Sequence, residues 1–312
     1  MLFAYAPDSA KLRLLPADAD LTSAIWVDLC RPAPDEVTRV AGLGVEVPTL
    51  EDMEEIELSN RLYREGGADY LTVVLPGMSG TQGSHSGPVC FILTTDRLIT
   101  VRHHAPRPFE TYPQRADKVG PGCGDPQRLL VSLMEEIVGR LADLLEGSGK
   151  ALDAIVRRVV GDDGSGLSDA LREVARESDL ISRVRLSLLT LERAISYFGQ
   201  TANAADLRPA IKGLMRDIQA LEVHGDFLTN RIAMASDLTL GMISVEQNKT
   251  VKIVSVVAVI FLPPTVIASA YGMNFANMPE LDWRWGYPMA VGLMLASAVG
   301  TYLFFRWKRW LS

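Results

Sequence analysis

The chain has 312 residues, a formal net charge of −7 at pH 7 and 48% hydrophobic residues. An acidic protein attracts cations and repels polyanions, so we expect no nucleic-acid partner. The three cysteines, Cys30, Cys90 and Cys123, are far apart and odd in number, a pattern that predicts neither a disulfide framework nor a metal-ligand cluster.

The first 126 residues have the pattern of an α/β domain. Short runs rich in β-branched and aromatic residues predict strands at residues 24–29, 70–75, 90–93 and 97–102. Asp35 is expected to cap a short helix. The segment 77–88 is rich in glycine and serine, and we expect it to be a loop that contains His85.

Residues 127–205 are expected to form an antiparallel helical arm. Apolar residues recur there at a helical spacing over 128–160 and 167–198, with a glycine- and aspartate-rich break between the two stretches. A third helix, the stalk, is expected to begin near Asp206 and to continue to residue 271. At 1.5 Å per residue such a helix is roughly 100 Å long.

Two uncharged apolar runs, residues 253–270 and 287–305, lie near the C-terminus. Each is long enough to cross a hydrocarbon core of roughly 30 Å, so we expect a membrane protein with a helical hairpin in the lipid bilayer. Basic residues flank the start of the hairpin and fill its tail, 306–312, whereas the connecting loop 272–286 has one base. The positive-inside rule then places both termini in the cytoplasm and the loop outside.

One face of the expected long helix carries mainly small and polar side chains. Before Asn274 it contains Ser269 and then, at intervals of three or four residues, Thr265, Leu262, Ala258, Ser255, Val251, Asn248, Ser244, Gly241 and Asp237. A coiled-coil seam prefers leucine and isoleucine at such positions. We therefore interpret this stripe as the lining of a water-filled pore, with loose packing of small residues between membrane helices as the alternative. Two spans cannot enclose a pore, so the interpretation requires a homo-oligomer.

The residues around the outer loop carry a family resemblance. Tyr-Gly-Met-Asn at 271–274 is followed by Met-Pro-Glu-Leu at 278–281, then by Gly-Tyr-Pro at 286–288 and the basic tail. This arrangement resembles the CorA family of divalent-cation transporters, most strongly over residues 248–311. A Gly-Met-Asn triplet alone is a weak signal, but its position between two C-terminal spans makes it specific.

The resemblance implies a funnel-shaped homopentamer in the inner membrane, with a cytoplasmic α/β domain, a long helical stalk and two C-terminal transmembrane helices. It implies passive entry of Mg²⁺, with Co²⁺ and Ni²⁺ as further substrates, and no cofactor. Gly272, Met273 and Asn274 correspond to the selectivity filter. A ring of Asn274 amides can bind Mg²⁺ through its hydration water, because Mg²⁺ sheds water reluctantly. Asp237 matches a family acid, a second metal contact near the cytoplasmic end of the pore. Val251, Val254 and Leu262 are expected constrictions, with ordinary packing of the span as the alternative, most of all for Val254.

Acidic residues outside the pore have weaker assignments. Glu280 and Asp282 are expected to concentrate cations at the outer mouth, with ordinary solvated carboxylates as the alternative. Gap-free extension of the stalk puts Gly213 where family members can carry a regulatory acid. Asp217 and Asp226 are candidate replacements for that acid, with ordinary solvated carboxylates as the favoured alternative.

Two other functions remain open. A zinc transporter of the same superfamily, with or without proton coupling, is favoured by Gly213, whereas the methionine of Gly-Met-Asn favours magnesium. A membrane-anchored sensor that transports nothing would need no polar stripe. We expect no enzymatic activity, because the sequence has no nucleophile motif and no phosphate-binding glycine loop.

Overall fold

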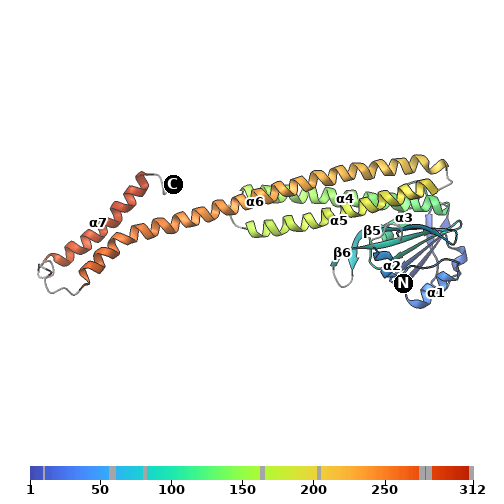
Figure 1. The fold of residues 1–312 in the computed structure, drawn as a ribbon, viewed down its shortest axis with the longest axis horizontal. Coiled ribbons are helices and arrows are strands. Elements are labelled where there is room, and N and C mark those ends of the chain that lie inside the picture. Colours follow the sequence, from blue (N-terminus) through green and yellow to red (C-terminus); the bar gives the residue numbers. More distant parts are fainter. Residues whose placement is uncertain are drawn as a thin grey trace. The chain divides into compact units, whose positions relative to one another are not determined.

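The computed structural model describes residues 1–9, 11–55, 61–79, 83–161, 166–201, 205–273, 278 and 283–308. The chain divides into two units, which are residues 1–161 with 168–236, and residues 162–167 with 237–312. Figure 1 shows the helices and strands in chain order.

The strands of the first unit form a seven-stranded sheet in the order β2-β1-β3-β7-β6-β5-β4. They are β1 (Leu2–Asp8), β2 (Lys11–Leu14), β3 (Trp26–Cys30), β4 (Leu62–Glu65), β5 (Ala68–Ser79), β6 (Gly83–Leu93) and β7 (Leu98–Arg102). Strands β3 and β7 are parallel, and the other adjacent pairs are antiparallel. The predicted α/β fold is therefore confirmed, although β1, β2 and β4 were not predicted.

The helices follow the predicted pattern closely. They are η1 (Leu21–Ser23), α1 (Pro34–Ala41), α2 (Leu50–Glu54), α3 (Pro108–Arg115), α4 (Pro126–Gly161), α5 (Leu167–Thr201), η3 (Ala205–Leu207), α6 (Arg208–Tyr271) and α7 (Gly286–Trp307). Helix α1 differs from the prediction, because Asp35 lies inside its first turn. The carboxylate of Glu36 closes that turn by accepting the backbone N–H of Ala33 at 2.8 Å.

The central strand β3 is covered on both faces, so all five of its residues are buried. Val27 and Leu29 point into one core, where they join Val40 of α1. Trp26 points to the opposite face, where its ring centroid lies 6.2 Å from that of Phe109 in α3. The alternation of side chains along one strand thus builds two apolar layers.

Helices α4, α5 and the first part of α6 run side by side within the first unit (Figure 1). Arg158 of α4 pairs with Glu173 of α5, and Arg185 of α5 pairs with Asp226 of α6 at 2.8 Å. Helix α5 also reaches the sheet, since the hydroxyl of Thr190 accepts the backbone N–H of Val74 in β5. The bundle is thereby tied to the α/β domain.

The prediction of a loop over residues 77–88 is wrong. Strands β5 and β6 form a long antiparallel hairpin in which Gly77 pairs with His85. The glycines serve packing, because a Cβ at Gly77 would lie 2.7 Å from the ring of His104 and one at Gly87 would lie 3.1 Å from it. The hairpin needs glycine at these two positions to accommodate that imidazole.

His104 is 2% exposed and its Nε2 lies 2.8 Å from the carbonyl oxygen of Leu75. Burial lowers the pKa of His104 from 6.5 to about 4. The neutral imidazole is therefore the form that fits the folded protein. Because the folded pKa lies below the unfolded one, its contribution to folding stability is fully present above pH 6.5 and is lost as the pH falls toward 4. We expect a loss of about 3 kcal/mol from this group.

The pH dependence of thermal unfolding checks this value. His104→Gln retains an amide donor for the Leu75 carbonyl and cannot titrate, so its melting temperature should fall less than that of wild type between pH 6.5 and 4. Equal losses in the two proteins would contradict the assignment. His224→Gln, a change at an exposed position of α6, is the matched control.

The second unit contains the two apolar helices. An 18-residue window of α6 has a mean hydropathy of 2.3 and one of α7 has 1.6, and 6% of each window is buried. Helix α6 continues through Pro263 and Pro264. Long apolar helices that leave their side chains uncovered are suited to lipid.

Candidate ion pathway

All the residues of the predicted stripe lie on α6, and each of them is exposed in the single chain. Intervals of three or four residues place them along one face of the helix. The remaining exposed surface between residues 251 and 270 carries larger apolar side chains, which include Ile253, Val254, Val257, Val259, Phe261 and Val266. The helix therefore combines a narrow face of mainly small and polar residues with a broad apolar surface.

Two hydroxyls on the stripe are oriented by the helix itself. Ser244 Oγ donates to the carbonyl of Leu240 at 3.1 Å, and Thr265 Oγ1 donates to that of Phe261 at 2.7 Å. Each hydroxyl hydrogen is thereby used within the helix, and the oxygen keeps lone pairs for acceptance. Such an oxygen suits a hydrated cation, because the hydrogens of the hydration water point away from the ion.

Helix α6 ends where the Gly-Met-Asn motif begins. The N–H of Gly272 donates to the carbonyl of Ala268 at 2.9 Å, and that of Met273 to Ala270 at 3.4 Å. A Cβ at Gly272 would lie 3.1 Å from the Ala268 oxygen, so glycine permits this close turn. Met273 is exposed.

Three predicted residues of the outer mouth, Asn274, Glu280 and Asp282, lie outside the described residues. The structure therefore places Gly272 and Met273 directly after the last turn of α6, and the roles of all five residues remain predictions.

The same face of α6 continues toward the N-terminus with large apolar residues. At the three- and four-residue spacing before Asp237 this face carries Met234, Asn230, Phe227 and Val223, and its three apolar members Met234, Phe227 and Val223 are 65%, 55% and 70% exposed. These apolar residues were not predicted from the sequence, because the predicted stripe ends at Asp237. Their helical spacing from Asp237 could have identified them.

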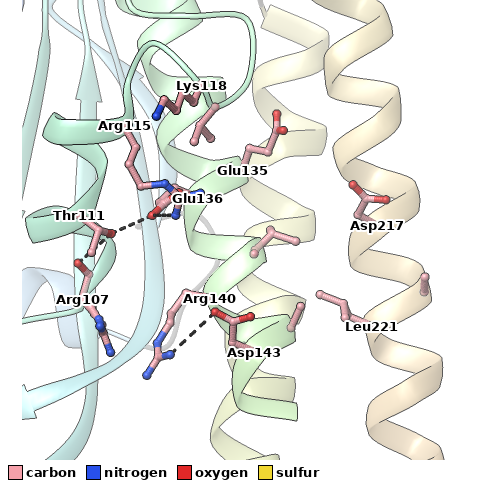
Figure 2. A pocket seen from close by; sticks show the side chains of 15 residues that line it. Arg107, Thr111, Arg115, Lys118, Glu135, Glu136, Arg140, Asp143, Asp217 and Leu221 are labelled. Atoms are coloured by element: carbon pink, nitrogen blue, oxygen red, sulfur yellow. Dashed lines mark hydrogen bonds and ion pairs between the residues drawn. The ribbon is translucent and has the colours of Figure 1, made fainter. Parts of the chain in front are cut away.

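The candidate regulatory acids of the stalk have different surroundings. A Cβ at Gly213 would meet no atom within 4 Å, so this chain leaves room for a side chain there. Asp226 forms an ion pair with Arg185 within the helical bundle. Asp217 lines a charged pocket between α3, α4 and α6 (Figure 2).

Together these features define a class of protein. An α/β domain is followed by the long helix α6, whose C-terminal part is apolar and carries the stripe, and by the apolar helix α7, so the chain is a membrane protein. The family model described as "CorA-like Mg2+ transporter protein" matches residues 22–309. The chain belongs to this family, which is a family of divalent-cation transporters.

Relatives and a solved structure agree with this assignment. The magnesium transport protein CorA of Pectobacterium atrosepticum is 34% identical over 317 residues, and that of Escherichia coli K12 is 33% identical, with all of each chain covered. The complete structure of the CorA magnesium transporter from Methanocaldococcus jannaschii has a TM-score of 0.72 at 16% identity. It covers 98% of this chain and 97% of that one, which supports the fold.

Proposed function

We propose that this protein is a passive entry pathway for Mg²⁺ and that copies of α6 surround the pore. The observation that carries the proposal is the stripe on α6, which is exposed in one chain and ends at the Gly-Met-Asn motif. Co²⁺ and Ni²⁺ are further expected substrates. The transporter needs no resident cofactor in this proposal.

In the proposed pathway the Asn274 amides select the ion by hydrogen bonding its hydration water. A neutral ring binds a divalent cation loosely enough for release, which a ring of carboxylates would slow. Glu280 and Asp282 raise the cation concentration outside the filter. Val251 and Leu262 form apolar constrictions, and Asp237 attracts the ion at the cytoplasmic end.

We propose a homopentamer in the inner membrane with both termini in the cytoplasm. Basic residues support the orientation, since Lys249 and Lys252 precede the first span and Arg306 and Lys308 follow the second. The exposed apolar residues of α6 support assembly, because large uncovered apolar patches mark interaction surfaces.

Phe227→Glu should weaken assembly, because it would place a charge where the apolar faces of neighbouring α6 helices meet. Native mass spectrometry in detergent should show the pentamer for wild type and mainly smaller species for the variant. Val160→Glu is the matched control, since Val160 is also an exposed apolar residue but lies on α4, and the pentamer of this variant should persist. A full pentamer of Phe227→Glu would show that this face of α6 does not lie in the interface between subunits.

Uptake into proteoliposomes, measured ion by ion under an inward-negative potential, tests the transport itself. We expect Mg²⁺ uptake that follows the potential and needs no proton gradient. Zn²⁺ uptake that depends on a pH gradient, with little Mg²⁺ uptake, would favour the zinc transporter. No flux of any divalent ion by the assembled protein would favour the membrane-anchored sensor.

A further inference from the structure

A pocket of about 740 Å³ opens between α3, α4 and α6 within the first unit (Figure 2). This volume is in the range of small-molecule sites. Four basic side chains line the pocket: Arg107, Arg115, Lys118 and Arg140. The ion pathway on the exposed face of α6 uses none of them.

Some of the lining charges are paired with one another. The carboxylate of Glu136, which is 9% exposed, accepts the Thr111 hydroxyl at 2.8 Å and the Arg115 guanidinium at 3.1 Å. Arg140 lies 3.9 Å from Asp143. The Glu136 contacts join α3 to α4, whereas Arg140 and Asp143 both belong to α4.

The remaining charges are segregated by sign. Arg107 immediately precedes α3 and Lys118 follows it, whereas Glu135 and Asp217 come from α4 and α6 (Figure 2). None of these four has a side-chain ion pair within the described ranges of the chain. Burial and the nearby Asp217 raise the pKa of the Glu135 carboxyl, as expected for two acids that share a site without a cation.

Apolar and small residues lie among these charged groups. Val138, Gly139, Ala142, Ala220 and Leu221 belong to the same pocket. The pocket thus offers unpaired bases, unpaired acids and an apolar surface for an organic group. A ligand that satisfies all three carries negative charge for the bases, a positive group or a bound cation for the acids, and an apolar part.

We propose that this pocket binds a nucleoside polyphosphate together with its Mg²⁺. Phosphate oxygens would be bound by Arg107 and Lys118, the hydrated metal by Glu135 and Asp217, and the nucleoside would lie against Leu221. Two unpaired charges of each sign fit a polyphosphate with a divalent ion better than a zwitterionic amino acid, which carries one of each. The proposal is independent of the ion pathway.

Calorimetric titration of ATP into the full chain in detergent, with Mg²⁺ or with EDTA throughout, tests the proposal. Titrating the nucleotide keeps metal binding in the pore out of the signal. We expect saturable binding with Mg²⁺ that weakens at least tenfold in EDTA. The double variant Arg107→Ala/Lys118→Ala should lose binding, and Asp217→Asn should lose most of the difference between Mg²⁺ and EDTA.

Matched changes outside the pocket separate a site from general charge effects. Arg176→Ala on α5 and Asp18→Asn near the sheet alter exposed charges and should leave ATP binding unchanged. The proposal is overturned by absent binding in the folded pentamer, by equal affinity in Mg²⁺ and EDTA, or by binding that survives the double variant. Preferential binding of lysine or glutamate would also overturn it.

Discussion

Asn274→Ala should reduce Mg²⁺ uptake by more than tenfold while the protein still assembles. The amide is the group proposed to hydrogen bond the hydration water, and the loss of one hydrogen bond to a charged partner costs about 1.5–3 kcal/mol. Every copy in the ring loses its amide at once. Proteoliposome uptake with an Mg²⁺-sensitive dye measures the effect.

Asn277 provides the control, because it is a second amide in the same loop and lies outside the Gly-Met-Asn motif. Asn277→Ala should transport nearly as wild type does. Undiminished, divalent-selective uptake by Asn274→Ala would remove Asn274 from the filter.

Arg102→Ala should cause the largest loss of stability in the α/β domain. Asp28 and Arg102 lie on the adjacent strands β3 and β7 and are 1% and 4% exposed. Arg102 Nη2 donates to Asp28 Oδ2 at 2.8 Å, and Thr100 also donates to this carboxylate at 2.8 Å. Removal of the guanidinium leaves a buried carboxylate without its charged partner, at a cost of about 3–5 kcal/mol.

Thermal melting of the full chain in detergent measures this loss, with near-ultraviolet circular dichroism of the aromatic side chains, which include Trp26, as the signal. Arg172→Ala is the control, since Arg172 pairs with Asp169 on the surface of α5 and an exposed pair contributes at most about 1 kcal/mol. Similar melting temperatures for the two variants would show that the buried pair contributes little.

The helices were predictable because their periodicity is local. The apolar spacing over 128–160 and 167–198 predicted α4 and α5 to within a few residues. The sheet was harder to predict. Strand β1 pairs with β3 and β2 only after the chain folds, and its short sequence, which ends in Pro7-Asp8, gives a weak strand signal.

The β5–β6 hairpin shows why amino-acid composition led to the wrong prediction of a loop over residues 77–88. Glycine and serine usually mark loops, but Gly77 and Gly87 are small because His104 packs on them. That contact joins residues from β5, from β6 and from beyond β7, so no local window contains it. For the same reason the approach of His85 to His104, with ring centroids 6.2 Å apart, was not predicted.

The two candidate sites differ in the same way. The stripe on α6 is periodic in the sequence, so it was predicted residue by residue. The charged pocket combines side chains from three helices that are far apart in the sequence, and Lys118 and Asp217 have no common local pattern.

In the proposed function the stripe of α6 faces an aqueous ion pathway. Cysteine substitution can test it in the otherwise native chain, because Cys30, Cys90 and Cys123 are buried. Burial also raises the pKa of the Cys90 thiol to about 12, which keeps it unreactive toward thiol reagents.

The most direct measurement is Mg²⁺ uptake before and after treatment with a charged, water-soluble thiol reagent. Ser255→Cys and Leu262→Cys lie on the stripe, whereas Ile253→Cys and Ile260→Cys lie on the opposite side of the same turns. We predict that the reagent blocks uptake only in the two stripe variants. Block in the Ile253 and Ile260 variants, with full uptake in Ser255→Cys and Leu262→Cys, would contradict this account.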